Sequence, residues 1–193
     1  MGSRTRDLPP RTGIAGLLRE LRYQEVARQG IGLLLMPLYA LLCRPLPGLF
    51  LAGAALAVAG ALVRLYASGY ITKNQELATV GPYSLVRHPL YTGNLLLLAG
   101  FTLASGLWWA VLLSLLFWWF YYPTAIEYED RKLRRIFGQP CADWQQATPA
   151  VIPSGLVPKR GGSWSLRTSM SRNAEPLVLA YSAFWLGWIY WQL

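Results

Sequence analysis

Five apolar stretches alternate with polar segments along the 193-residue chain. Apolar stretches with few charged residues are typical of helices that cross a bilayer. The first stretch is short for a hydrocarbon core of about 30 Å, so we expect its helix either to take in residues on the side of Gln29 and Gly30 or to tilt little. The pattern predicts an all-α, polytopic integral membrane bundle. The five transmembrane helices are expected over residues 31–43, 49–66, 89–104, 107–122 and 176–191.

The connections between these stretches indicate which helices are neighbours. Residues 44–48 make a short break between the first two helices, and the second helix carries small residues such as Gly53 and Gly60. Small residues let two helix backbones approach closely, so we expect these two helices to pack as a hairpin. The third and fourth helices are joined only by Ser105-Gly106, which predicts a tight helical hairpin with no soluble loop.

Polar segments follow the fourth helix. Beyond Pro123, residues 124–137 have a helical pattern with many charges, which predicts a further helix that leaves the membrane and ends at Gly138. Residues 159–171 are rich in Gly, Ser and Arg and are expected to form an exposed linker. We therefore divide the chain into a basic interfacial segment (1–29), a membrane core (30–153), a cytoplasmic linker (154–175) and a C-terminal transmembrane helix (176–193).

Composition supports a membrane protein with a basic surface. Hydrophobic residues make up 54% of the chain and charged residues 14%, against about 25% charged residues in soluble domains. The net charge of +9 comes from residues that flank the apolar stretches. This placement favours anionic lipid headgroups as partners and argues against nucleic acid. Residues 1–29 are expected to include a basic amphipathic helix on the membrane surface.

The distribution of Lys and Arg predicts the orientation. Of the 18 basic residues, only Arg44 falls on one side of the predicted membrane. The positive-inside rule therefore makes the other side, with the N-terminus and both polar segments, cytoplasmic. Cys43 and Cys141 lie on opposite sides in this topology, so no disulfide between them is expected.

One turn-rich stretch between apolar helices carries most of the candidate chemistry. Residues 81–93 contain Arg87, His88 (the only histidine), and Tyr83 and Tyr91. Pro89 suits the first turn of a helix, so the two basic side chains precede a helix N-terminus, which attracts anions. The stretch either binds a carboxylate or phosphate or caps a membrane helix against lipid. A lone histidine without a cysteine pair argues against a metal site.

A second candidate is Glu129, which lies within the apolar stripe of the segment after Pro123 when residues are placed at 100° intervals. A carboxylate on a buried face needs a partner. Two alternatives follow: an ion pair with Arg87 or Arg64, or contact with a polar ligand.

The acidic neighbours of Glu129 lie at the edge of that stripe. Glu127 and Asp130 are each spaced four residues from an arginine, Arg131 and Arg134 respectively. This spacing predicts ordinary surface ion pairs for both.

Short motifs occur in a fixed order on both sides of the tight hairpin. They are Gly81-Pro82-Tyr83, Arg87-His88-Pro89, Tyr91-x-Gly93, Glu129-Asp130-x-x-Leu133, Phe137-Gly138 and Pro149-x-x-Ile152-Pro153. In this order the chain, over about residues 50 to 153, resembles the isoprenylcysteine carboxyl methyltransferase and phospholipid methyltransferase family of integral membrane enzymes. It departs from the family pattern at Asp130, at Cys141 and Trp144, and at Ala125, where the prenylcysteine enzymes carry a substrate-associated basic residue.

The resemblance implies an S-adenosylmethionine site capped by the cytoplasmic segments, with a lipophilic acceptor entering from the bilayer. The acceptor would be a prenylated cysteine carboxylate, a lipid amine or another isoprenoid-like lipid. Arg87 is the predicted residue that orients the acceptor, and Tyr91 is a second choice. The cofactor contacts that the resemblance implies are Gln75, Glu76, Leu77, Ala78, Tyr83, His88, Pro89, Leu90, Tyr91 and Glu129.

Two other function classes stay open on the sequence alone. The core is also similar to membrane sterol reductases, which would use NADPH, although the chain is short for that class. A non-enzymatic membrane scaffold or small transporter is the other alternative, although the five predicted helices show no internal repeat.

Overall fold

The computed structural model describes residues 4–71, 76–171 and 174–193. These residues form an all-helical protein, with one isolated β-bridge between Gly81 and Lys159 and no strand in the described ranges. The helices are α1 (Gly13–Tyr23), α2 (Glu25–Leu41), α3 (Pro47–Ser68), the 3-10 helix η1 (Pro82–Ser84), α4 (Pro89–Ala104), α5 (Trp108–Phe137), α6 (Gln139–Ala147), α7 (Leu166–Ser171) and α8 (Glu175–Trp191).

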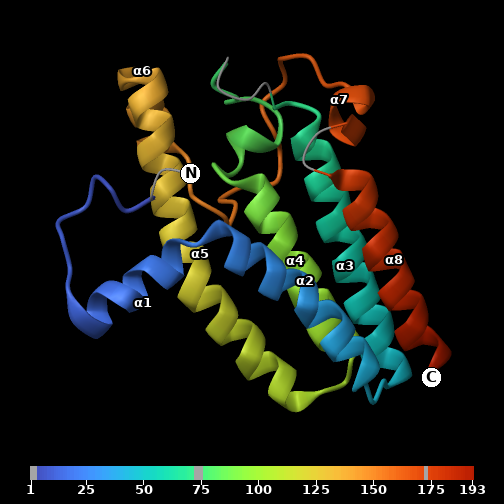
Figure 1. Ribbon diagram of the computed structural model, residues 1–193. Helices are drawn as coiled ribbons and strands as arrows, with labels where there is room; N and C mark the ends of the chain where they lie inside the picture. Colours follow the sequence, from blue (N-terminus) through green and yellow to red (C-terminus); the bar gives the residue numbers. More distant parts are fainter. Residues whose placement is uncertain (1–3, 72–75, 172–173) are drawn as a thin grey trace.

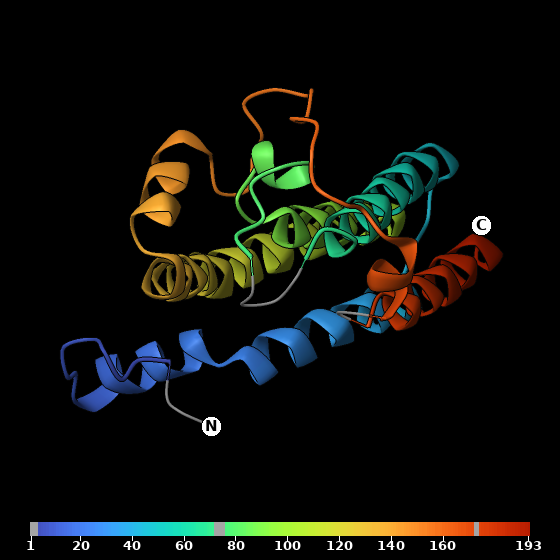
Figure 2. The same ribbon diagram turned by 90° about the horizontal axis from the view of Figure 1, so that it is seen from above.

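The helices form two groups that face each other (Figure 1). Figure 2 shows α1, α2 and α8 on one side of the group made by α3, α4 and α5. The segment around η1 and the chain that follows α6 lie on the opposite side of that group. The polar connectors therefore gather at one end and one face of the apolar helices.

The apolar pattern predicted these helices well. Helices α3, α4 and α8 match three of the expected ranges to within two residues at each end. Helix α2 begins at Glu25, six residues before the first apolar stretch, which agrees with the expectation that this helix takes in residues on the N-terminal side. Two helices, α3 and α5, are long and apolar enough to cross a membrane, and α4 is a shorter apolar helix. The protein is therefore a helical protein of membrane character, and the count of five spans stays a prediction.

The expected break at Pro123 is wrong, because α5 runs without interruption from Trp108 to Phe137. A proline inside a helix leaves nearby carbonyl groups without their usual donors. Here Arg22 Nε donates to Phe120 O at 3.0 Å, and Thr124 Oγ1 donates to Tyr121 O at 3.0 Å. These side chains give two carbonyls beside the proline a donor, and the helix continues through Pro123.

Two short helices were not predicted. Helix α6 begins directly after Gly138, whose φ of 64° makes the turn out of α5. Helix α7 falls inside the segment 159–171, which was expected to be linker throughout. Both are short and largely polar, so the apolar pattern carried little signal for them.

Close backbone packing joins α3 to α4, and the expectation that it joins the first two helices is wrong. A Cβ atom built on Gly53 would lie 2.5 Å from Gly100 O, and one on Gly60 would lie 2.7 Å from Gly93 O. The two helix backbones therefore touch along a row of small residues. Helix α2 packs instead on α4, α5 and α8.

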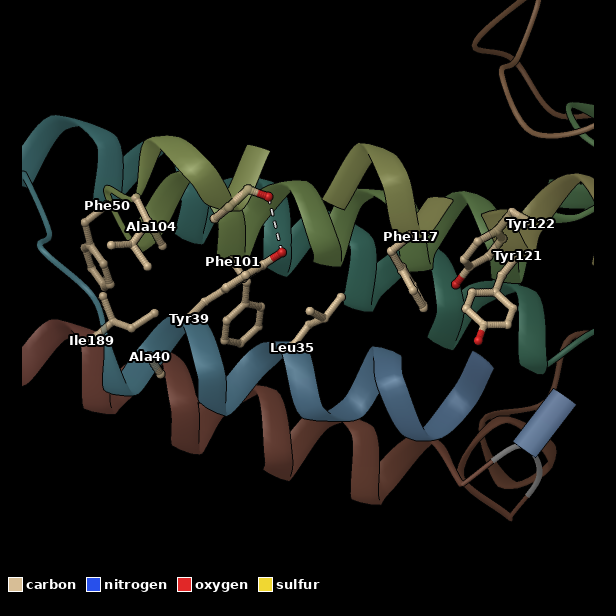
Figure 3. Packing of buried hydrophobic residues seen from close by; sticks show 12 residues of the cluster. Leu35, Tyr39, Ala40, Phe50, Phe101, Ala104, Phe117, Tyr121, Tyr122 and Ile189 are labelled. Carbon is tan, nitrogen blue, oxygen red and sulfur yellow. Dashed lines mark hydrogen bonds between the residues drawn. The ribbon is translucent and has the colours of Figure 1, made fainter. Parts of the chain in front are cut away.

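The core lies between α2 and α8 on one side and α4 and α5 on the other (Figure 3). Tyr39, Phe101 and Ile189 are completely buried there. Tyr39 Oη donates to Ala110 O at 3.2 Å and lies 2.8 Å from Ser114 Oγ. These two contacts tie α2 to α5. The free thiols of Cys43 and Cys141 confirm that the two cysteines do not pair.

Candidate functional site

A cavity of about 880 Å³ opens between α2, α4, α5 and the connector before η1. One end is polar and includes Glu25, Glu129 and His88. The other end is apolar and extends between the helices to Phe101 and Phe117. A single cavity therefore joins charged groups at the polar end of the bundle to the apolar interior.

The structure brings nearly all of the predicted site residues to this cavity. Pro89 is fully buried and does not line it, and Gln75 lies outside the described residues. The predicted residues in the cavity wall are Glu76, Leu77, Ala78, Tyr83, Arg87, His88, Leu90, Tyr91 and Glu129.

Asp130 joins the turn-rich stretch to α5. Arg87 Nη2 donates to Asp130 Oδ2 at 2.7 Å, and His88 Nε2 lies 2.9 Å from Asp130 Oδ1. The predicted surface pair of Asp130 with Arg134 is wrong, since Arg134 binds Gln145 Oε1 instead. The other predicted surface pair is confirmed, with Glu127 Oε1 3.0 Å from Arg131 Nε.

The same stretch is also held by α6 and the chain after it. Arg87 Nη1 donates to the carbonyl oxygens of Gln145 and Thr148 at 2.7 and 2.8 Å. The backbone N–H of His88 donates to Ala150 O at 2.9 Å. Both terminal nitrogens of Arg87 thus bind the protein, which suits a residue that holds the cavity wall. Its role toward an acceptor stays a prediction.

The pKa values of two groups at the wall, the half-buried Asp130 and the buried Tyr83, are shifted from their usual values. Burial acts to raise the pKa of Asp130, but the hydrogen bond and charge of His88 and the charge of Arg87 outweigh it and lower that pKa below its usual value. Burial raises the pKa of the Tyr83 phenol far above its usual value, and the negative charge of Glu175 adds to this effect. Asp130 is therefore anionic and Tyr83 neutral at physiological pH.

Replacing Asp130 with Asn is expected to destabilise the protein by about 1 to 3 kcal/mol, because Arg87 and His88 lose their charged acceptor. Since the pKa of Asp130 is lowered on folding, its contribution is complete above the unfolded value and is lost as the pH falls through the folded value. Unfolding in detergent at neutral pH measures the effect. The control is Asp143→Asn, which makes the same change at an exposed position in α6. Equal stability of the two variants would show that the contacts of Asp130 do not hold the stretch.

Glu129 faces the cavity from α5. Within the described residues no hydrogen bond or ion pair engages its carboxylate, whereas Arg87 pairs with Asp130 and Arg64 pairs with Glu175. The predicted ion-pair alternative for Glu129 is therefore wrong. Contact of Glu129 with a polar ligand stays a prediction.

Aromatic rings form the middle of the cavity. The Tyr91 ring stacks on the His88 ring, with centroids 5.4 Å apart. It also meets the Tyr122 ring edge-on, with centroids again 5.4 Å apart. The Arg28 guanidinium lies over both tyrosine rings, 5.0 and 5.3 Å from their centroids. These rings separate the polar end from the apolar end.

The sequence model of the phospholipid methyltransferase family matches residues 45–140. The chain belongs to this family. The matched part runs from α3 to the start of α6 and contains Glu129, Asp130 and the turn-rich stretch. The family takes its name from phospholipid methyltransferases.

Two curated relatives are named as metal-resistance proteins. The chain is 37% identical over 138 residues to the cobalt-zinc-cadmium resistance protein CzcN of Cupriavidus metallidurans, covering 70% of this chain and 60% of the relative. It is 38% identical over 128 residues to the nickel-cobalt-cadmium resistance protein NccN of Alcaligenes xylosoxydans xylosoxydans, covering 64% and 57%. The match thus spans less than two thirds of each relative. No solved structure matches the chain.

Several cavity residues lie outside the family match and were missed from the sequence. Glu25, Arg28 and Gln29 come from the first turns of α2, and their helical spacing of three and four residues was the one available signal. Glu175 of α8 binds Arg64 across more than 100 residues, so no local pattern predicted that pair. The described residues contain no cluster of three or more His, Cys, Asp or Glu suited to a metal ion.

Proposed function

We propose that this protein transfers a methyl group from S-adenosylmethionine to a lipophilic acceptor at the membrane. The observation that carries the proposal is the Glu129 carboxylate, which faces a cavity with one polar and one apolar end and has no ion-pair partner among the described residues. Within a methyltransferase family, such a cavity suits a polar cofactor beside an apolar acceptor.

The residues at the polar end fit this cofactor. Glu129 would accept hydrogen bonds from the ammonium or hydroxyl groups, because a carboxylate is an acceptor only. The rings of His88 and Tyr91 offer stacking and cation–π surfaces for the adenine and the sulfonium. Glu76, Leu77 and Ala78 also line the cavity.

The bound cofactor would supply an electrophilic methyl group. The protein's contribution would be to orient an acceptor in line with it and to exclude water from the apolar end, which apolar and aromatic side chains line. Tyr91 lies where the two ends meet and is the closest of the predicted catalytic residues to that role. A carboxylate acceptor would need no general base, whereas an amine or thiol would need to lose a proton.

The apolar end suits an acceptor that enters from the bilayer. A prenylated cysteine carboxylate, a lipid amine and another isoprenoid-like lipid all combine a polar reacting group with an apolar tail. If this chain also serves in metal resistance, as the names of its relatives state for them, methylation of a membrane-associated acceptor is the step we assign to it. We place the cavity opening on the cytoplasmic side, as the basic residues of the connectors predict.

Calorimetric titration of the purified protein in detergent tests the cofactor. We expect S-adenosylhomocysteine to bind and NADPH not to bind. Binding of NADPH alone would favour the reductase alternative, and binding of neither would favour a non-enzymatic scaffold.

Replacing Glu129 with Gln is expected to weaken S-adenosylhomocysteine binding by about 1.5 to 3 kcal/mol, the range for charged hydrogen bonds. Glu127→Gln is the matched control, because Glu127 is exposed and binds Tyr23 and Arg131 outside the cavity. Titration calorimetry measures both variants. Equal losses in the two would contradict the assignment of Glu129 to the cofactor.

A further inference from the structure

A buried cation lies where the polar and apolar ends of the cavity meet. Only 7% of the Arg28 side chain is exposed to solvent. Its guanidinium lies over the rings of Tyr91 and Tyr122, which form the floor between the two ends. A charged group held at this depth is costly to bury, so it indicates a partner or a ligand.

In the part of the chain that the structure describes, the charge of Arg28 meets one distant carboxylate and the neutral hydroxyl of Tyr122. Among the described residues its one ion pair is with Glu25, whose Oε1 lies 3.9 Å from Nη2. This distance is longer than a hydrogen bond. Glu25 is also shared, because Gln29 donates to its Oε1 at 2.9 Å and Arg4 donates to its Oε2.

The other arginines of the cavity wall are matched more closely. Arg64 binds Glu175 at 2.8 Å, Arg87 binds Asp130 at 2.7 Å, and Arg4 binds Glu25. Lys132 lies ten residues beyond Tyr122 on α5 and therefore further from the apolar end. Arg28 is thus the cation placed to meet the polar group of a molecule whose apolar part lies deeper.

One face of α2 continues from Arg28 into the apolar end. Gly32, Met36 and Tyr39 follow it at intervals of three and four residues and line the same cavity. From Arg28 to Tyr39 the helix rises by about 16 Å, which suits an extended hydrocarbon tail. Leu97 and Phe101 of α4 and Phe117 of α5 face this part from the other side.

We infer that Arg28 binds the acidic headgroup of an anionic, single-tailed amphiphile and so selects anionic acceptors over amines. This inference rests on the proposed function, since it names the acceptor class of that site. The positive charge would repel a protonated amine, and the tyrosine rings limit access of water to the pair. A carboxylate held there needs no proton removed before methyl transfer.

Fluorescence titration of the full chain in phosphatidylcholine nanodiscs tests the inference. The probes are dansyl-labelled undecanoate and its matching carboxamide, with protein-free nanodiscs as background. We expect undecanoate to bind on the order of ten-fold tighter than the amide, as one charged hydrogen bond allows. In Arg28→Met, which keeps an apolar stem of similar length, this preference should disappear.

Two controls separate the outcomes. Arg11→Met removes the same charge at an exposed position outside the cavity and should keep the preference. S-adenosylhomocysteine binding, measured separately, should be unchanged in Arg28→Met. If Arg28→Met lost affinity equally for undecanoate and for S-adenosylhomocysteine, Arg28 would belong to the cofactor site and the inference would be overturned.

The unmodified protein decides the matter if Arg28→Met fails to fold. Equal affinity of the natural sequence for undecanoate and its amide would overturn the inference, whether or not S-adenosylhomocysteine binds. Failure of S-adenosylhomocysteine to bind, with the undecanoate preference intact, would instead count against the proposed methyl transfer.

Discussion

Replacing Gly100 with alanine is expected to destabilise the protein by about 3 kcal/mol, an effect at the upper end for added volume in a packed core. A Cβ atom at this position would lie 2.6 Å from Ala57 N and 2.6 Å from Gly53 O. These atoms belong to the backbone of α3, so they cannot move aside as a flexible side chain would. Helices α3 and α4 would have to separate.

Gly187→Ala is the matched control for this change. Gly187 lies in α8, an equally apolar helix, and a Cβ atom there meets nothing within 4 Å. Alanine favours a helix over glycine by up to about 1 kcal/mol, so this variant should be neutral or slightly more stable. Thermal unfolding in detergent, followed by circular dichroism, measures both. The same unfolding temperature for the two variants would contradict backbone contact between α3 and α4.

The packing of α3 on α4 illustrates what the apolar pattern could predict. The small residues of α3 indicated that another helix comes close, and one does. They did not identify the partner, because Gly53 and Gly60 would accept any helix with small residues at matching positions. The matching glycines, Gly93 and Gly100, lie in the next helix of the chain, and the closest contact is between sequential helices after all.

In the site, too, the sequence predicted what depends on one helix and missed contacts between distant segments. The inward direction of Glu129 follows from its place on one helix, and the structure puts it in the cavity wall. Asp130 sits one residue further on, near the edge of the stripe, and was assigned to the surface. Its true partners, Arg87 and His88, come from a segment more than 40 residues earlier, so helical spacing alone could not predict the contact.

Glu175→Ala is expected to lower the free energy of unfolding by about 3 to 5 kcal/mol, because it would leave the buried Arg64 without its counter-ion. Glu175 is 1% exposed, and it accepts from Arg64 Nε at 3.1 Å, Arg64 Nη2 at 2.8 Å and Ser68 Oγ at 2.8 Å. The surface pair of Asp7 with Arg135 has nearly the same length, 2.7 Å, but both side chains are about half exposed. Asp7→Asn should therefore cost less than about 1 kcal/mol.

The Arg64–Glu175 pair lies between the family core and a helix outside the family match. Arg64 stands on α3 and lines the cavity, whereas Glu175 begins α8. If the pair only fastens α8, replacing both residues with methionine should restore most of the stability lost by Glu175→Ala, because a buried ion pair adds little over apolar packing. S-adenosylhomocysteine binding by the doubly substituted protein then separates two roles for Arg64. Unchanged S-adenosylhomocysteine binding would show that the pair only holds α8 to α3. Weakened binding in a stable protein would show that the pair also supports the cavity wall. No recovery of stability by the double change would contradict the fastening itself.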